Sequence, residues 1–244
     1  GRYADVYPIL LELFPHRLEL LDFRSHRLST ADPAALSRFE VRVTLLHQFI
    51  GLADTAGDIT IHSPLRELPM KVCIHRGTEQ IGGTCIEFSA AGDRIAIDFG
   101  LPLDADPADS SLVPKVAGDD LRGVVISHPH IDHYGLLHHL TGDVPVAIGS
   151  AARQIIQAAA PFTGQPLPKL DGYDLTHGQP INIGAFRITP YLVDHSAYDA
   201  YALLIEAEGK RLFYSGDFRG HGRNADRFEQ LLATILAAAQ AQRF

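Results

Sequence analysis

HPHIDH, at residues 128–133, is the most informative stretch of this 244-residue chain. It directly follows GVVIS at residues 123–127, an apolar run that predicts a buried strand ending in a loop. Its polar members are His128, His130, Asp132 and His133, three imidazoles and one carboxylate within six positions. Imidazole and carboxylate are the ligands that suit zinc and neighbouring metals. A lone histidine is usually a packed or solvated residue, but this cluster predicts a metal site.

Further carboxylate and imidazole side chains stand at the ends of other predicted strands. His195 lies in VDHS at residues 193–196, Asp217 in YSGD at 214–217, and Asp98 in IDFG at 97–100. Strand ends on a rigid sheet can present ligands at fixed geometry. A purely structural zinc is the competing interpretation, but such sites are usually closed, thiolate-rich and four-coordinate. No cysteine lies near this cluster in the sequence, and there are too many candidate ligands for one closed site.

Bulk composition is that of an ordinary globular protein, with 46% hydrophobic and 20% charged residues. The length allows one large domain, or one domain with an extension. No apolar stretch is long enough to span a membrane and no signal peptide is evident, so we expect a cytoplasmic protein without a membrane partner. The net charge of −8 argues against broad nonspecific binding of nucleic acid, although a local basic groove stays open. Cys73 and Cys85 are interpreted as buried free thiols.

The pattern of the chain changes near residue 70, which predicts two regions. Residues 1–69 form an N-terminal extension of unknown role, with helix-like apolar spacing over 9–21 and 33–52. Residues 70–244 are rich in strand patterns. We expect strands over 70–76, 84–89, 94–99, 121–127, 145–148, 181–183, 186–193, 200–206 and 211–214. Helices are expected over 134–140, 151–160 and 227–242.

The ordered set of motifs resembles the metallo-β-lactamase-fold superfamily of metallohydrolases over roughly residues 70–220. The resemblance implies an α/β (α+β) fold, a four-layer αββα sandwich with the metals at one edge. By this resemblance His128, His130 and His195 would hold one metal. Asp132 and His133 would hold the second, Asp217 would bridge the two, and Asp98 would orient the ligand loop from behind. Histidine at position 130 favours two Zn²⁺ ions, with Mn²⁺ as the alternative.

Two metals sharing a hydroxide would lower the pKa of its parent water and stabilise the oxygens of a displacement. Asp132 has a second candidate role here, as the catalytic residue that orients the attacking water. The resemblance therefore implies a metal-dependent hydrolase. The superfamily cleaves phosphodiesters, thioesters, lactams and lactones, so the fold alone does not select a substrate.

Local motifs favour phosphodiester cleavage. DHSAYD at residues 194–199 and SGDFR at 215–219 resemble the ribonuclease J-like and β-CASP nuclease branch. GTEQIGG at 77–83 also resembles a loop that lies near the active site in that branch, although a simple glycine turn is an equal alternative. Arg219 and Arg223 follow the bridging aspartate and could clamp phosphate oxygens, although solvated surface arginines are an equal alternative. The expected partner is therefore nucleic acid, RNA in particular. The runner-up is a small-molecule ester substrate, as in glyoxalase II or a lactonase, which the negative net charge favours.

The chain departs from the family pattern after Asp217. Only 27 residues follow, where the family normally has more strands and a last histidine ligand. We therefore expect a sandwich that is incomplete at the C-terminus, with association into a homo-oligomer or with a completing chain to cover the exposed face. His221 is the only later histidine and is a candidate ligand or proton donor. A truncated metal-binding remnant without activity is the third functional interpretation.

Overall fold

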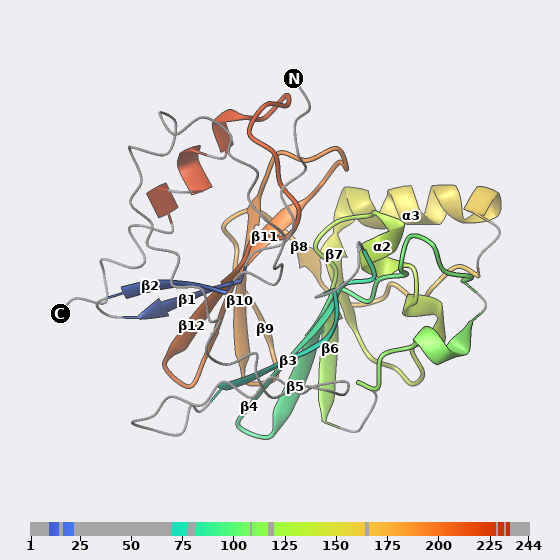
Figure 1. Cartoon of the computed structure of the whole chain (residues 1–244), viewed down its shortest axis with the longest axis horizontal. Helices are drawn as coiled ribbons and strands as arrows, with labels where there is room; N and C mark the ends of the chain where they lie inside the picture. The colour runs from blue at the N-terminus through green and yellow to red at the C-terminus, as the bar shows by residue number, and fades with distance from the viewer. Residues whose placement is uncertain are drawn as a thin grey trace.

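The computed structural model describes residues 10–14, 17–21, 70–77, 82–107, 109–116, 120–163, 166–227, 229–231 and 233–234. In these residues two six-stranded sheets lie face to face, and helices α2 and α3 cover the outer side of one of them (Figure 1).

The first sheet carries the segment that leads into the histidine cluster. Its strand order is β3 (Met70–Arg76), β4 (Cys85–Ala90), β5 (Asp93–Ile97), β6 (Leu121–Val125), β7 (Val146–Gly149) and β8 (Asp174–Leu175). Strands β3 to β5 are antiparallel, and β5 to β8 run parallel. Because β5 and β6 are parallel neighbours, their carboxyl ends meet at one edge, and the loops that follow them start side by side.

Two helices lie on the outer side of this sheet. The helical segments that pack with this sheet are η2 (Ser110–Leu112), α2 (Ile131–Tyr134), η3 (Leu137–His139) and α3 (Ser150–Thr163). The expected single helix over 134–140 is instead two short turns. The backbone N–H of Leu136 donates to the carbonyl of Phe99 rather than to its own helix, so the α-helical ladder stops after Gly135.

The second sheet is antiparallel throughout. Its order is β2 (Arg17–Leu21), β1 (Leu10–Phe14), β12 (Lys210–Tyr214), β11 (Tyr201–Ala207), β10 (Phe186–Leu192) and β9 (Ile181–Ile183). Strand β1 pairs with β12 along Leu10–Glu12, so residues of the N-terminal region lie beside the strand that leads to Asp217.

The expectation of a helix over residues 9–21 is therefore wrong. The described residues of this range form β1 and β2, which pair with each other from Leu10–Leu21 to Phe14–Arg17. Pro15 stands between the two five-residue runs, and proline interrupts a helical ladder while it is tolerated between strands. The expected helix over 33–52 lies outside the described residues. The boundary at residue 70 stays a prediction.

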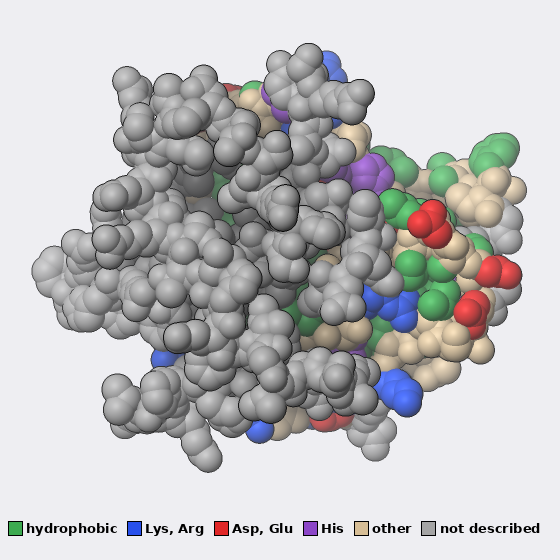
Figure 2. Space-filling model, viewed as in Figure 1, with side chains coloured by type: hydrophobic (Ala, Val, Ile, Leu, Met, Phe, Trp, Pro, Cys, Tyr) green, Lys and Arg blue, Asp and Glu red, His purple; other side chains and the backbone are tan. Residues whose placement is uncertain are grey.

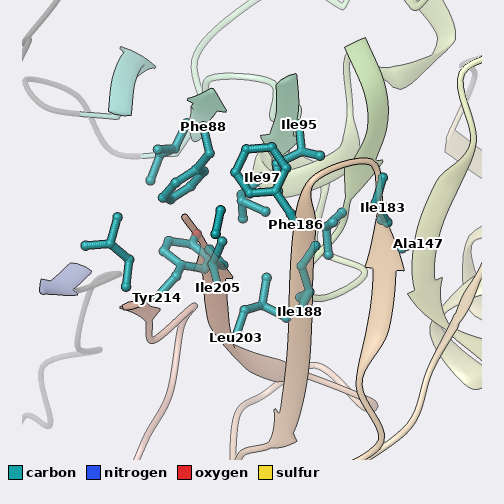
Figure 3. Packing of buried hydrophobic residues seen from close by; sticks show 14 of the residues in the cluster. Phe88, Ile95, Ile97, Ala147, Ile183, Phe186, Ile188, Leu203, Ile205 and Tyr214 are labelled. Atoms are coloured by element: carbon teal, nitrogen blue, oxygen red, sulfur yellow. The ribbon is translucent and has the colours of Figure 1, made fainter. Parts of the chain in front are cut away.

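Successive hydrophobic side chains of the central strands point to opposite faces of each sheet, and they form three separate clusters. Between the sheets, one cluster contains Phe88, Ile95, Ile97, Ile183, Phe186, Ile188, Leu203, Ile205 and Tyr214 (Figure 3). The neighbouring strand residues Ala96, Val124 and Ile126 point to the opposite side and pack with Ala152 and Ile156 of α3. A third cluster on the outer face of the second sheet includes Leu204, Phe213 and the helical Leu231. This alternation gives helix, sheet, sheet and helix, the expected four layers.

The nine strands expected downstream of residue 70 are confirmed to within two residues at each end. Strand β8 was missed because two residues carry no periodic signal. Described residues of 227–234 are helical, and the rest of that expected helix lies outside the described part of the chain.

The described surface has a mixed character. On the face drawn in Figure 2, acidic and basic side chains both occur beside α2 and α3, interspersed with hydrophobic ones. No helix among the described residues is long and apolar enough to cross a membrane.

Candidate metal centre

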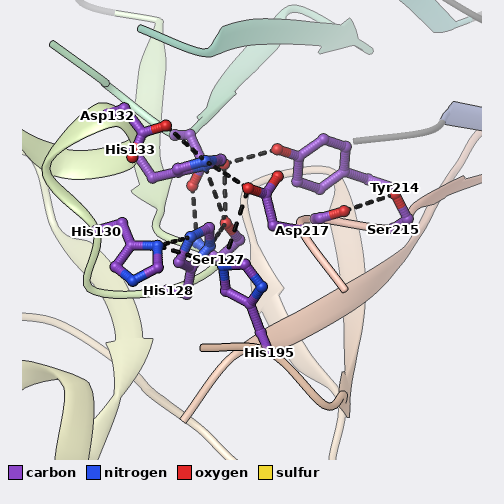
Figure 4. A network of polar contacts seen from close by, with 11 residues as sticks. Ser127, His128, His130, Asp132, His133, His195, Tyr214, Ser215 and Asp217 are labelled. Carbon is purple, nitrogen blue, oxygen red and sulfur yellow. Dashed lines mark hydrogen bonds and ion pairs between the residues drawn. The ribbon is translucent and has the colours of Figure 1, made fainter. Parts of the chain in front are cut away.

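The predicted ligands come together at one edge of the sandwich, on segments that follow three strands (Figure 4). The loop after β6 contributes the histidine cluster, the loop after β10 contributes His195, and the loop after β12 contributes Asp217. Two backbone hydrogen bonds hold the end of β6, where the histidine cluster begins, against neighbouring segments. Asp98 N–H donates to the carbonyl of Val125 at 2.8 Å, and Tyr201 N–H donates to the carbonyl of Ser127 at 2.9 Å.

Three imidazoles form the first donor group. Nδ1 of His130 lies 3.1 Å from Nε2 of His128 and 3.2 Å from Nε2 of His195. Nδ1 of His128 lies 3.0 Å from the hydroxyl of Ser127. Because that hydroxyl donates to Asp98, His128 must carry its proton on Nδ1 and present the lone pair of Nε2 to the group. Three nitrogens thus face one point, which is the arrangement a tridentate cation site requires.

His133, Asp132 and Asp217 form the second donor group. Nε2 of His133 lies 3.7 Å from Oδ2 of Asp132 and 3.6 Å from Oδ2 of Asp217. The same Asp217 oxygen is 3.9 Å from Nε2 of His195, which belongs to the first group. Asp217 therefore lies between the two donor groups, and its bridging role stays a prediction.

Asp98 holds the ligand loop from behind. Its fully buried carboxylate accepts hydrogen bonds from Ser127 N–H at 2.7 Å and Ser127 Oγ at 2.9 Å. Oδ2 also accepts from Nδ1 of His133 and from the hydroxyl of Tyr214, both at 2.7 Å. With Nδ1 committed to Asp98, His133 offers Nε2 to the second donor group.

Electrostatics at this centre favour a positive charge between the carboxylates. Burial alone would lower the pKa of His133, but Asp98 and Asp217 raise it well above its ordinary value. Burial opposes ionisation of Asp217, yet the hydrogen bond and charge of His133 hold the pKa of that carboxyl below its usual range. Burial and the neighbouring imidazoles lower the pKa of His128 well below its ordinary value. Its ring is therefore uncharged at pH 7 and can offer a nitrogen lone pair to a cation.

These residues fit divalent cations. Oδ1 of Asp217 is buried and has no hydrogen-bond partner among the described residues, although buried carboxylate oxygens are normally satisfied. Two overlapping sets of these side chains, His128–His130–His195 and His128–His133–Asp217, each bring three candidate ligand atoms within 4.8 Å of one another. A cation at each group would satisfy the orphan oxygen and the converging nitrogens.

Glycines allow the ligand loop to approach its neighbours closely. A Cβ at Gly100 would lie 1.7 Å from the carbonyl oxygen of Asp132, and one at Gly82 would lie 2.7 Å from the Cβ of Asp132. Gly82 thus lies against Asp132, while residues 78–81 of the same stretch lie outside the described residues.

Replacing Gly100 by alanine is therefore expected to displace the segment that carries Asp132 and His133. The clash is with backbone, so we expect a loss of about 1–3 kcal/mol of stability together with weaker metal binding. Thermal unfolding and metal titration check this. Gly142→Ala is the control: a Cβ there meets nothing within 4 Å, so its cost should be limited to backbone strain and metal affinity should not change. Equal metal affinity in both variants would contradict the expectation.

Arginines lie beside the first donor group. Arg219 and Arg223 line a cavity of about 390 Å³ whose wall also includes His195. Nε of Arg219 donates to Oδ2 of Asp194 at 3.3 Å, so part of its guanidinium is already engaged. Their predicted role as phosphate contacts, and that of His221 as ligand or proton donor, stay predictions. His221 is exposed and belongs to neither donor group.

Asp194 fixes the loop that carries these arginines. Its buried carboxylate accepts from the backbone N–H of Gly222 at 2.6 Å and of Asn224 at 3.3 Å. Its backbone carbonyl accepts from Arg219 N–H at 2.7 Å. The residue before His195 thus holds the arginine loop in place.

Sequence reasoning missed the partners behind the ligands. Ser127 and Tyr214 were treated as strand residues, and Asp199 only as part of a motif. Asp199 has φ +64 and accepts from Ala152 N–H at 2.9 Å and from the hydroxyl of Tyr201 at 2.7 Å, which ties the His195 loop to the start of α3. The available signal was adjacency: Ser127 precedes His128, and Asp199 lies four residues after His195.

Comparison with protein families gives one match. The model described as "Beta-lactamase superfamily domain" matches residues 94–242, which is more than half of the chain and includes every proposed ligand.

Curated relatives are similar at low identity. Ribonuclease J of Helicobacter pylori is 25% identical over 152 residues, covering 59% of this chain and 22% of that protein. Ribonuclease J of Mycobacterium tuberculosis is 26% identical over 172 residues, covering 66% of this chain and 30% of that protein. The chain thus spans less than a third of the length of these relatives.

Among solved structures, a protein of unknown function from Enterococcus faecalis V583 is similar, with 26% sequence identity and a TM-score of 0.56. The match covers 67% of this chain and 47% of that one.

Proposed function

This chain belongs to the β-lactamase superfamily, and within that family we propose that it is a metal-dependent hydrolase that cleaves phosphodiester bonds of nucleic acid, RNA in particular. The metallo-β-lactamase-type fold and the likeness to ribonuclease J, both expected from the motifs, are confirmed. The observation that carries the proposal is the arginine-lined cavity that shares His195 with the metal centre. The names of the curated relatives support the same substrate class.

We propose that the centre holds two divalent cations, zinc by its ligand types and manganese as the alternative. His128, His130 and His195 would hold one, and Asp132, His133 and Asp217 would surround the other. When bound, such cations lower the pKa of water and neutralise charge that builds up on phosphate oxygens.

The chain's own residues supply orientation and charge. The Asp132 side chain is 18% exposed, so it can accept a hydrogen bond from an attacking water and orient it. Asp98 and Ser127 keep His133 and His128 in fixed tautomers. Arg223, and the part of Arg219 not engaged by Asp194, would neutralise the substrate phosphate from the side of His195.

The first test compares substrates on purified protein of measured metal content. We expect about two zinc or manganese ions per chain, hydrolysis of bis-p-nitrophenyl phosphate, and no hydrolysis of S-lactoylglutathione. Arg219→Ala should lower turnover of the phosphodiester, because an anion loses its cationic partner. Arg187→Ala is the matched control, because Arg187 is an exposed arginine that pairs with Glu206 between β10 and β11. This variant should turn over the phosphodiester at the wild-type rate.

Other results would select another function. Cleavage of S-lactoylglutathione alone would favour the small-molecule hydrolase. Metal binding with neither activity would favour the metal-binding remnant. Equal loss of both activities in Arg219→Ala would remove the argument for a phosphate contact.

A further inference from the structure

The cavity beside His195 has features that scissile-phosphate chemistry does not use. Its lining includes Tyr198 and Arg227 in addition to the arginines considered above. We propose that this cavity, which we call the arginine pocket, binds the nucleotide next to the scissile phosphate, with its base on Tyr198 and its phosphate at Arg227. The inference rests on the proposed function and narrows its substrate to single-stranded nucleic acid.

Size and position fit one nucleotide. The volume of about 390 Å³ lies in the range of small-ligand sites, about 300–1,000 Å³. The wall runs from His195, a proposed metal ligand, to residues 219–227 after β12. A chain whose phosphate sat at the metal centre would therefore pass its neighbouring nucleotide into the pocket.

The charged groups that a ligand in the pocket would meet are mainly guanidinium groups. Arg219, Arg223 and Arg227 line it, and no ion pair of Arg223 or Arg227 is found among the described residues. Two carboxylates also line it, but both are turned to protein donors. Asp194 accepts from Gly222, Asn224 and Arg219, and Asp199 accepts from Ala152 and Tyr201. In a chain of net charge −8, this local excess of guanidinium is a specific anion site rather than part of a general basic surface.

The two loops that line the pocket are preorganised by hydrogen bonds within the protein. The buried Asp194 carboxylate holds the loop of residues 219–224, and a Cβ at Gly222 would lie 2.1 Å from its Oδ2. Asp199 holds the opposite loop through α3. Preorganised donors bind an anion with less ordering cost than flexible ones.

Tyr198 supplies the aromatic surface. Its side chain is 70% exposed at the rim of the pocket, although aromatic rings are usually covered. A base can stack on such a ring, and stacking is tolerant of sequence but requires an unpaired base. A duplex would keep its bases stacked on each other, which is why the pocket selects single strands.

The test compares a short fluorescent single-stranded RNA with bis-p-nitrophenyl phosphate, which has no base. Tyr198→Ala and Arg227→Ala should each lower kcat/KM on RNA about tenfold or more, mainly through KM, and this loss should exceed the loss on bis-p-nitrophenyl phosphate by a similar factor. Tyr198→Phe should restore RNA cleavage, because the ring is kept. Tyr173→Ala and Arg187→Ala are matched controls away from the pocket and should change neither substrate.

Binding separates failure of this inference from failure of the proposed function. Fluorescence anisotropy with the same RNA needs no turnover, so it reports on the pocket even if no phosphodiester is cleaved. Weaker RNA binding in Tyr198→Ala and Arg227→Ala, with binding restored in Tyr198→Phe, supports the pocket. Wild-type affinity in both alanine variants, equal affinity for duplex and single strand, or equal losses on both substrates would overturn it.

Discussion

Replacing His130 by alanine is expected to reduce bound metal from about two ions per chain to one or fewer and to abolish hydrolysis. Nδ1 of His130 faces Nε2 of both His128 and His195, so its loss leaves two nitrogens where a cation needs three or four donors. Loss of groups that only orient a ligand costs about 10–100-fold in affinity or activity. We therefore expect at least about a 100-fold loss of activity for a ligand itself.

The fold should survive this change. His130 is partly exposed and lies outside the three hydrophobic clusters, so no core contact is removed. His138→Ala is the matched control, because His138 lies eight residues on and belongs to neither donor group. Elemental analysis, turnover and thermal unfolding of both variants check the expectation. If His130→Ala kept both its metal and its activity, the assignment of this centre would be wrong.

Much of the candidate site could be predicted from sequence because its residues are marked locally. His128, His130, Asp132 and His133 share six positions, and the apolar run before them marks the strand that presents them. The strands were also predictable, since both sheets are buried between layers and their apolar runs are continuous or alternating.

What could not be predicted depends on contacts between distant segments. The pairing of β1 with β12 joins residues about 200 positions apart, and no local pattern encodes that partner. The apolar spacing of residues 9–21 is compatible with a helix and with a strand. Pairing with β12 at the edge of the sheet selects the strand. The arginine loop likewise depends on Asp194, which bonds residues 25 to 30 positions further along the chain.

Changing Asp98 to asparagine is expected to damage stability and metal binding together. Asp98 has φ +58, a region that asparagine tolerates, so the change isolates the side chain from the backbone. Oδ2 accepts from Ser127, His133 and Tyr214, and an amide group there would present hydrogens to at least one of these donors. Burial and the Asp98 carboxylate also raise the pKa of the Tyr214 hydroxyl well above its ordinary value, so that group remains a donor.

The expected loss of stability in Asp98→Asn follows from the number of hydrogen bonds that the buried carboxylate accepts. Hydrogen bonds to charged groups contribute about 1.5–3 kcal/mol each. We expect a loss of about 3 kcal/mol, a fall of about 6–12 °C in Tm for a chain of this length, and a 10–100-fold loss of metal affinity. Asp143→Asn is the matched control, since Asp143 is almost fully exposed in its pair with Lys169 and should shift stability by less than about 0.5 kcal/mol.

Tyr214→Phe separates the two effects of Asp98. It removes one donor to Oδ2 but leaves Asp98 bonded to His133, so stability should fall while metal affinity stays close to wild type. If Asp98→Asn lowered Tm without weakening metal binding, the carboxylate would serve the core alone. Loss of metal affinity in Asp98→Asn but not in Tyr214→Phe would assign the orientation of His133 to Asp98, because only that variant changes the group that fixes its tautomer.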